Sequence, residues 1–400
     1  MDYFRINALK LKVAFNKIGR MRRQLLTIQA FRGLAAVLVV TRHATLISQN
    51  KFGQNFIGGI FAQGGIGVDF FFVLSGFILL FVHIKDIGQS HKVRSFAIKR
   101  IIRIYPIYWV ITILCLPFFF LSISEEKSFN GDWWYLINSF LLVPQEKLPL
   151  LSPAWTLTHE LYFYILAALL IYYWNSKIAR AIFLTIVFGS LYKAFFDFAG
   201  TWDYKYRTYQ TILDSNFLLS FIFSRFNLEF FAGCVSAFLA HKYLLNENKR
   251  KNKHKTIKQI NSAKLIFSVL SIIFLFIFLI SPDSLSFIYK NKILMIFWYS
   301  CVVSILLYVS TIMEYLTSFK PGSFLKFLGD ASYSIYLVHY PALFLFVKIL
   351  FLIKLEIILG STLTMYLIVF LSLVLSILAY LYIELPVWNW SKKRVSGFVK

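Results

Sequence analysis

Long apolar segments dominate the chain, and short basic segments separate them. A helix needs about 20 mostly apolar residues to cross the hydrocarbon core of a bilayer. Ten segments of the 400-residue sequence fit this description: 27–47, 66–84, 101–122, 155–174, 178–196, 217–240, 264–280, 293–313, 332–353 and 360–383. The pattern therefore predicts an all-α polytopic membrane protein, a single bundle of about ten transmembrane helices.

The amino-acid composition agrees with a membrane location for most of the chain. Hydrophobic residues make up 58% of the sequence and charged residues only 15%, whereas an ordinary soluble domain is about 25% charged. The three cysteines, Cys115, Cys234 and Cys301, all fall in apolar segments, where free cysteine packs as a small hydrophobic residue. We therefore expect neither a disulfide framework nor a metal site.

Basic residues gather in the connections between the apolar segments. The formal net charge is +24, and the positive-inside rule places such connections on the cytoplasmic side of a membrane. The N-terminal arm, the connections at 85–100 and 241–259, and the tail all reach that side if the number of spans is even. We therefore expect both termini to be cytoplasmic, with a basic arm at 1–24, a membrane domain at 25–386 and a basic tail at 387–400. This charge suits the anionic inner leaflet, and we do not expect nucleic acid as a partner.

The first apolar span holds an arginine and a histidine on one face. An ionisable side chain at mid-membrane costs about 2.5–3.5 kcal/mol on insertion scales, so it usually faces the bundle interior or water. Arg32 and His43 are eleven residues apart, which is about three helical turns, or about 16 Å along the axis. They therefore predict a polar path through the bundle. Alternatively, Arg32 extends its charge to the cytoplasmic interface and His43 is a packing histidine.

The second span begins with the glycine-rich stretch GGIGVDFFFVLSGFIL, residues 64–79. Its glycines permit close approach to a neighbouring helix. Asp69 lies in the first turn of this span, where the helix dipole favours a carboxylate. It either caps the helix or orients His43, as carboxylates orient catalytic histidines.

Two arginines mark the cytoplasmic start of the third span. Arg100 and Arg103 are three residues apart in RSFAIKRIIRIYPIYW, so they lie on one helix face. Two guanidinium groups on one face can bind a phosphate through paired hydrogen bonds. The alternative is positive-inside anchoring, which explains Arg100 better than Arg103. Pro106 can kink the helix and open space beside it.

The fourth span opens with aromatic and ionisable residues in SPAWTLTHELYFYIL. Trp155 and His159 are four residues apart, as are Glu160 and Tyr164, so the members of each pair can touch. The aromatic residues form either an interfacial belt or a platform on which a sugar ring stacks. We include Trp155, His159 and Tyr164 among the candidate substrate-binding residues.

Three later spans carry further polar groups. Arg225 and Glu229 are four residues apart in the sixth span, and we expect them to pair with each other. Tyr336 and His339 share one face of the ninth span and extend the polar path. Glu384 ends the tenth span, where it caps the helix or pairs with a cation of a loop.

Five motifs occur together in the order that is typical of one enzyme family, and the chain resembles the acyltransferase 3 family of integral membrane acyltransferases over roughly residues 25–386. The motifs are Arg32 with His43, GVDFFFVLSGF with Asp69, Arg100 and Arg103 before IYP, the segment with Trp155, Glu160 and Phe163, and GDASYSIYLVH. The chain departs from the family at His159, where members usually have another residue. It also shows no extracytoplasmic hydrolase-like domain, so we expect any second transfer enzyme to be a separate protein.

The resemblance implies a function and a location. Family members move acyl groups, commonly acetyl, to surface sugars, so we expect a multi-pass protein of the bacterial cytoplasmic (inner) membrane. The expected donor is acetyl-CoA or another acyl-CoA, and the expected acceptor is a hydroxyl of O-antigen of lipopolysaccharide, capsule, exopolysaccharide or another lipid-linked or surface carbohydrate. The competing interpretation is a transporter or flippase for a polar lipid or saccharide, because intramembrane ionisable residues also line substrate paths. The hydropathy pattern shows no inverted repeat to support it.

The resemblance also implies roles for the polar residues. Arg100 and Arg103, assisted by Arg32, are expected to hold the phosphates of coenzyme A. His43 is expected to act as general base on the sugar hydroxyl, with Asp69 or Glu160 orienting it. An acyl-histidine intermediate is the alternative.

Overall fold

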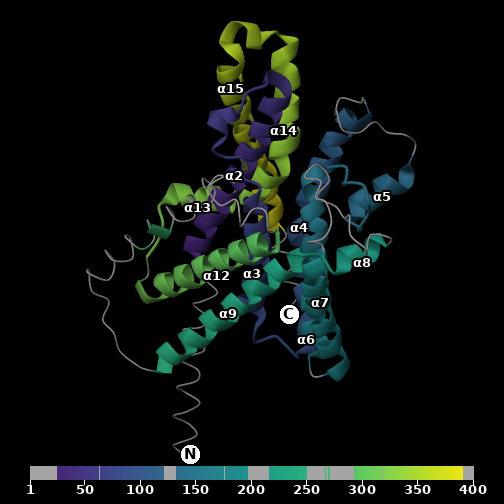
Figure 1. Ribbon diagram of the computed structural model, residues 1–400, viewed down its shortest axis with the longest axis vertical. Coiled ribbons are helices and arrows are strands. Elements are labelled where there is room, and N and C mark those ends of the chain that lie inside the picture. Colours follow the sequence, from purple (N-terminus) through teal and green to yellow (C-terminus); the bar gives the residue numbers. More distant parts are fainter. Residues whose placement is uncertain are drawn as a thin grey trace, which may run out of the picture.

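The computed structural model describes residues 25–62, 64–120, 132–174, 176–196, 216–249, 266, 269–270, 292–317 and 319–390. All regular structure in these residues is helical (Figure 1). The predicted arm at 1–24 and most of the predicted tail lie outside the described residues, as does most of the predicted span 264–280.

The first half of the chain forms α2 (Leu26–Phe52), η1 (Phe56–Gly59), α3 (Ile66–His83), η2 (Ser90–Lys92), α4 (Val93–Phe120), α5 (Trp133–Leu141), η3 (Ser152–Ala154), α6 (Trp155–Tyr173) and α7 (Lys177–Phe196). The second half forms α8 (Phe217–Ile222), α9 (Phe226–Lys249), α12 (Lys292–Thr317), α13 (Ser323–Asp330), α14 (Ser332–Leu352), α15 (Leu355–Ala379) and the π-helical turn η6 (Tyr380–Glu384).

Eight helical segments among the described residues are long and apolar enough to cross a membrane. They are Leu26–Phe52, Ile66–His83, Ser90–Pro117, Ser152–Tyr173, Phe217–Asn246, Ile296–Thr317, Ser332–Leu352 and Leu355–Trp390. The predicted span 178–196 forms α7, which carries Lys177, Arg180 and Lys193 and is not one of the eight. The all-α membrane fold is therefore confirmed, whereas the number of ten spans and the cytoplasmic termini stay predictions.

Small residues allow the helices at the centre of the molecule to approach closely. A β-carbon at Gly76 of α3 would overlap the carbonyl oxygen of Phe230 in α9, and one at Gly233 of α9 would overlap that of Val73 in α3. This reciprocal contact makes α3 and α9 one of the closest helix pairs, as small residues do in membrane helices. In Figure 1, α9 runs beside α12, while α2, α14 and α15 stand together as a second group.

A carboxylate from another helix fixes the start of α2. Glu314, near the end of α12, accepts hydrogen bonds from the backbone N–H groups of Leu26 (2.9 Å) and Thr27 (2.8 Å) and from the Thr27 hydroxyl (2.6 Å). It thereby satisfies donors that the first helical turn leaves free and complements the positive end of the helix dipole. This contact fixes the beginning of the helix that carries Arg32 and His43.

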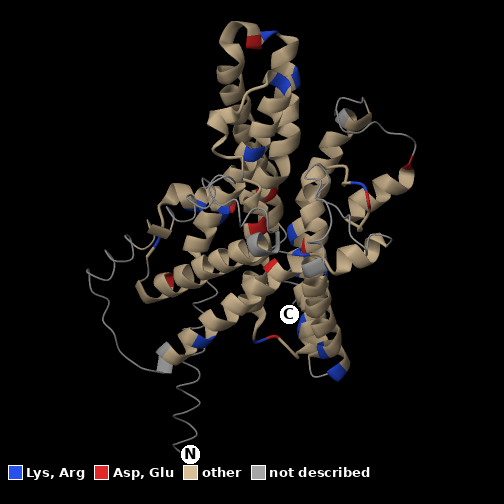
Figure 2. Ribbon diagram, viewed as in Figure 1, with Lys and Arg blue, Asp and Glu red and all other residues tan. Residues whose placement is uncertain are grey.

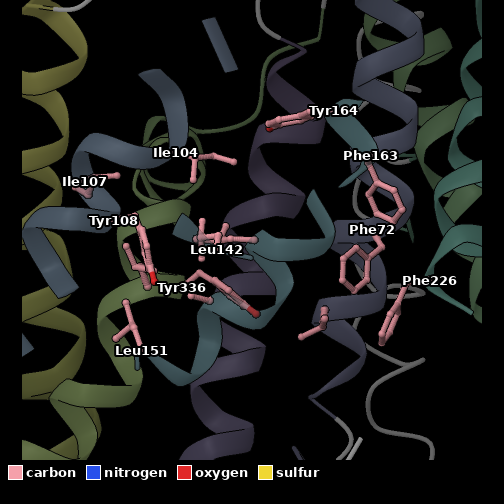
Figure 3. Packing of buried hydrophobic residues seen from close by; sticks show 14 of the residues in the cluster. Phe72, Ile104, Ile107, Tyr108, Leu142, Leu151, Phe163, Tyr164, Phe226 and Tyr336 are labelled. Atoms are coloured by element: carbon pink, nitrogen blue, oxygen red, sulfur yellow. The ribbon is translucent and has the colours of Figure 1, made fainter. Parts of the chain in front are cut away.

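Aromatic side chains fill the interior, and apolar side chains cover the outside. The ring of Phe72 lies 4.6 Å from that of Phe226 and 5.8 Å from that of Phe163 (Figure 3). Large hydrophobic residues such as Ile178, Phe188 and Leu352 are exposed, as expected for surfaces that face lipid. Figure 2 shows few charged residues along the helices, but acidic and basic positions also occur near the centre of the view, where α2, α3 and α4 come together.

Candidate active site

Arginines and carboxylates from four helices come together in one cluster. Arg103 of α4 interacts electrostatically with Glu160 of α6 and with Glu384 of η6, and Arg32 of α2 interacts with the same two carboxylates and with Arg103. We call Arg32, Arg100, Arg103, Glu160 and Glu384 the charged cluster. These groups surround the Arg103 guanidinium, while the residue as a whole keeps exposed surface.

The first turn of α14 holds the Glu384 carboxylate in the charged cluster. The Ser334 hydroxyl donates to Glu384 Oε2 at 2.5 Å, and the Ser334 backbone N–H donates to the same oxygen at 3.2 Å. A helix N-terminus favours an anion at this position. Tyr333, the preceding residue, donates its hydroxyl proton to the carbonyl oxygen of Ile104 at 3.1 Å, which ties α14 to α4 beside Arg103.

Arg32 and Arg100 are each held by neighbours. Arg32 donates to Gln29 Oε1 at 3.0 Å, and Gln29 in turn donates to Asp330 at 2.9 Å. The guanidinium carbon of Arg100 lies 5.3 Å from the centre of the Tyr164 ring, within the range of a cation–π contact. The Tyr164 hydroxyl donates a short hydrogen bond to Glu160. The predicted pairing of Glu160 with Tyr164 is therefore present, and it lies inside the charged cluster.

A pair of histidines lies further along the bundle. The His43 ring of α2 lies 5.2 Å from the His339 ring and 4.9 Å from the Tyr340 ring of α14. His339 Nδ1–H donates to the carbonyl oxygen of Ile335 at 3.0 Å, so its Nε2 is the acceptor nitrogen of the ring. That Nε2 is buried and has no hydrogen-bond partner. We call His43 and His339 the histidine pair.

Helix α14 connects the charged cluster to the histidine pair. Tyr333 and His339 are six residues apart, which corresponds to about 9 Å along a helix axis. Tyr336 lies between them, and its hydroxyl accepts a hydrogen bond from Thr156 of α6 at 3.0 Å. On α2, Arg32 lies at the charged cluster and His43 lies at the histidine pair. The residues that the sequence grouped as a polar path thus occupy adjoining helices rather than separate outward faces.

The structure places Asp69 at a different level from His43. Gly64, two residues before α3 begins, lies against the carbonyl oxygen of Leu38, and Gly67 of α3 lies against that of Ala35. The segment 64–67 and α2 therefore run in opposite directions. Asp69 is two residues further along α3 and therefore lies near the level of residue 33, about ten residues before His43. This offset corresponds to about 15 Å along the axis. Asp69 makes no hydrogen bond or ion pair among the described residues, and the structure brings His339, not Asp69 or Glu160, to His43.

His159 lies in a third environment, lined by aromatic rings. The centre of its ring lies 4.5 Å from that of Phe221, 5.0 Å from that of Phe226 and 5.7 Å from that of Trp155. The His159 Nδ1–H donates to the carbonyl oxygen of Trp155 at 3.2 Å, and its buried Nε2 has no partner. Only 3% of His159 is exposed, so any substrate contact at this residue requires the surrounding rings to move.

Several residues of this region had no assigned role in the sequence interpretation. Ser334, Tyr333 and Tyr340 belong to the late motif GDASYSIYLVHYP, but a hydroxyl in an apolar helix gives no sign of which helix it faces. Glu384 was interpreted as a cap or a partner of a loop cation. It accepts hydrogen bonds from the first turn of α14, and it also faces Arg32 and Arg103. Among the described residues, no group of three or more His, Cys, Asp or Glu side chains could hold a metal ion.

Comparisons with known proteins agree with the predicted family. A family model described as an acyltransferase domain, Acyl_transf_3, matches residues 25–381. The chain is 26% identical over 351 residues to the peptidoglycan O-acetyltransferase OatA of Listeria monocytogenes, covering 82% of this chain and 51% of that protein. It is 24% identical over 301 residues to the O-acetyltransferase OatA of Staphylococcus aureus, covering 70% of this chain and 46% of that protein. The chain thus spans about half the length of these relatives. No solved structure matches it.

Proposed function

Because the chain belongs to the acyltransferase 3 family, we propose that it is a membrane O-acyltransferase. It moves an acyl group, most simply acetyl, from acyl-CoA in the cytoplasm to a hydroxyl of an extracytoplasmic carbohydrate. The single observation that best supports this function is the polar path along α14, which joins the charged cluster to the histidine pair.

The charged cluster is the part of the chain that suits the donor. Coenzyme A carries several phosphate charges, and three guanidinium groups offer the paired N–H donors that phosphate prefers. Arg100, Arg103 and Arg32 therefore hold the phosphates at the cytoplasmic mouth. The uncharged pantetheine arm extends past Tyr333 and Tyr336, so no charged nucleotide has to enter the apolar part of the bundle.

The histidine pair is the part that suits the chemistry. His43 removes the proton of the acceptor hydroxyl, whose oxygen attacks the carbonyl carbon of the thioester. The carbon–sulfur bond breaks, and the departing coenzyme A thiolate takes a proton back from His43. A histidine is suited to this exchange because its ordinary pKa lies near neutrality. Attack by His43 itself, with an acyl-histidine intermediate, is the alternative route to the same products.

The acceptor is proposed only as a class. The two O-acetyltransferase relatives support O-acetylation, and the relative from Listeria monocytogenes, a peptidoglycan O-acetyltransferase, supports a surface carbohydrate as the acceptor. O-antigen, capsule and exopolysaccharide contain comparable free hydroxyl groups. Trp155 offers an aromatic face on which a sugar ring could stack, whereas the ring of Tyr164 is buried beside Arg100.

The test separates an enzyme from a transporter. Membranes that contain the protein are supplied with acetyl-CoA labelled in the acetyl group, together with a surface carbohydrate acceptor. The enzyme releases free coenzyme A and places the label on the carbohydrate as an ester. A protein that moves the label or a saccharide across the membrane while leaving the thioester intact would contradict the proposal and would favour the transporter.

The acceptor is then identified by comparing the surface polysaccharides of cells with and without the gene. An O-acetyl ester shifts the NMR signals of the sugar ring at the modified carbon. The polysaccharide that loses this signal in the deletion strain is the acceptor.

A further inference from the structure

Two residues that the mechanism does not use hold Arg100 in place from the connection after α3. His83 is the last residue of α3, and Asp86 follows one turn later. The Asp86 backbone N–H donates to the carbonyl oxygen of His83 at 2.8 Å. The same two residues also meet through their side chains, because His83 Nδ1 lies 2.8 Å from Asp86 Oδ2.

The hydrogen bonds around His83 fix where its proton resides. A carboxylate only accepts, so His83 Nδ1 carries the proton that Asp86 accepts. The Arg100 nitrogen Nη2 lies 3.0 Å from His83 Nε2. Since a guanidinium only donates, His83 Nε2 is the acceptor and the imidazole is neutral. Both hydrogen bonds, from His83 to Asp86 and from Arg100 to His83, can form only with this arrangement of protons.

Aromatic rings flank the Arg100 guanidinium. Its central carbon lies 5.4 Å from the centre of the Phe96 ring and 5.3 Å from that of the Tyr164 ring. The Phe96 ring also meets the edge of the His83 ring at 5.0 Å. The Nε of Arg100 is buried and makes no hydrogen bond, whereas its Nη2 is held by His83.

We propose that the Asp86–His83 pair positions Arg100 for the phosphates of acyl-CoA without neutralising its charge. A carboxylate in direct contact with Arg100 would compensate the cation and compete with phosphate. The neutral imidazole of His83 lies between Asp86 and Arg100. It orients the guanidinium through a hydrogen bond and prevents direct contact between the guanidinium and the carboxylate. His83 and Asp86 are therefore positioning residues, and this inference rests on the proposed donor.

The test measures the dissociation constant of coenzyme A for the purified full-length protein in lipid nanodiscs. His83→Leu removes the acceptor, whereas His83→Gln keeps an amide oxygen for Arg100 and an N–H for Asp86. Loss of a hydrogen bond to a charged group is expected to weaken coenzyme A binding by about ten-fold or more in His83→Leu. The His83→Gln variant should bind within about two-fold of the wild type, because the hydrogen-bonding roles are kept.

A matched control comes from the same connection. His91 is exposed in η2, and His91→Leu should leave coenzyme A binding unchanged. Equal binding by His83→Leu and the wild type would overturn the inference. Equally weak binding by His83→Gln and His83→Leu would also overturn it, because the ring rather than the hydrogen bonds would then matter. If the wild type binds no coenzyme A, the proposed donor itself is wrong, which is a separate failure.

Discussion

The imidazole rings of His43 and His339 lie 5.2 Å apart, although 296 positions separate the two residues in the sequence. His43 belongs to α2 and His339 to α14, and both helices also reach the charged cluster, α2 through Arg32 and α14 through Ser334. The sequence grouped His43 with Asp69 or Glu160, whereas the structure provides a second histidine. We therefore propose the histidine pair as the centre of acid–base chemistry in this protein.

Changing His43 to Ala should reduce acyl transfer by about 10²–10⁴-fold, because a positioned general base contributes about that factor. The measurement is the rate of labelled acetyl transfer to carbohydrate by membranes with equal amounts of protein. Coenzyme A binding should stay near that of the wild type, since the charged cluster is intact. Transfer at the wild-type rate would show that His43 is a packing residue.

Changing His339 to Leu should lower the turnover number by about ten-fold while leaving thermal stability unchanged or raised. The acceptor Nε2 of His339 is buried without a partner, and a buried unsatisfied polar atom costs about 1–3 kcal/mol. Removing it therefore costs the fold little, while His43 loses a neighbour that can accept its proton. Turnover and melting temperature are measured on the same preparation. A fall in both together would indicate a structural role.

His159→Leu is the comparison for that variant, because His159 has the same pattern of one backbone hydrogen bond and one unpartnered Nε2. If His159 contacts the acceptor, the KM for carbohydrate should rise about ten-fold with the turnover number preserved. Unchanged KM and turnover would make His159 a packing residue of the aromatic core.

Changing Arg103 to Lys should raise the KM for acetyl-CoA by about ten-fold, because an ammonium replaces a planar fork of N–H donors. Arg94→Lys provides the control, since Arg94 lies on the same helix and is exposed. The two variants are compared by initial rates over a range of donor concentrations. The same KM for both would assign Arg103 to membrane anchoring.

Changing Gly76 to Ala should destabilise the bundle by about 1–3 kcal/mol or more, the usual cost of inserting a methyl group into a closely packed contact. The added β-carbon overlaps the backbone of Phe230, which cannot move as a flexible side chain can. Ser75→Ala, one residue earlier, should have little effect, because Ser75 makes no hydrogen bond among the described residues. Thermal unfolding of both variants in nanodiscs tests this difference.

Local sequence patterns were sufficient for several of the helices and for contacts between residues of one helix. Arg100 and Arg103 lie on one helix face because helical geometry places residues three apart together, and the predicted contact between Glu160 and Tyr164 has the same cause. The spans at 27–47, 66–84, 155–174 and 332–353 correspond to α2, α3, α6 and α14. These apolar segments form helices because a backbone N–H or C=O group without a hydrogen bond is costly in lipid.

Which helices became neighbours was decided only in the tertiary structure. The sequence placed Asp69 near His43 because both lie at the predicted outer side, but the close crossing of α2 and α3 at Gly64 and Gly67 sets a register that separates them. The amino-acid sequence by itself determined the membrane helices, their polar faces and the family, because those follow from burial costs and periodicity within each segment. The partners of His43, Glu384 and Arg100 required the folded chain, because contacts between distant segments depend on the packing of all the helices together.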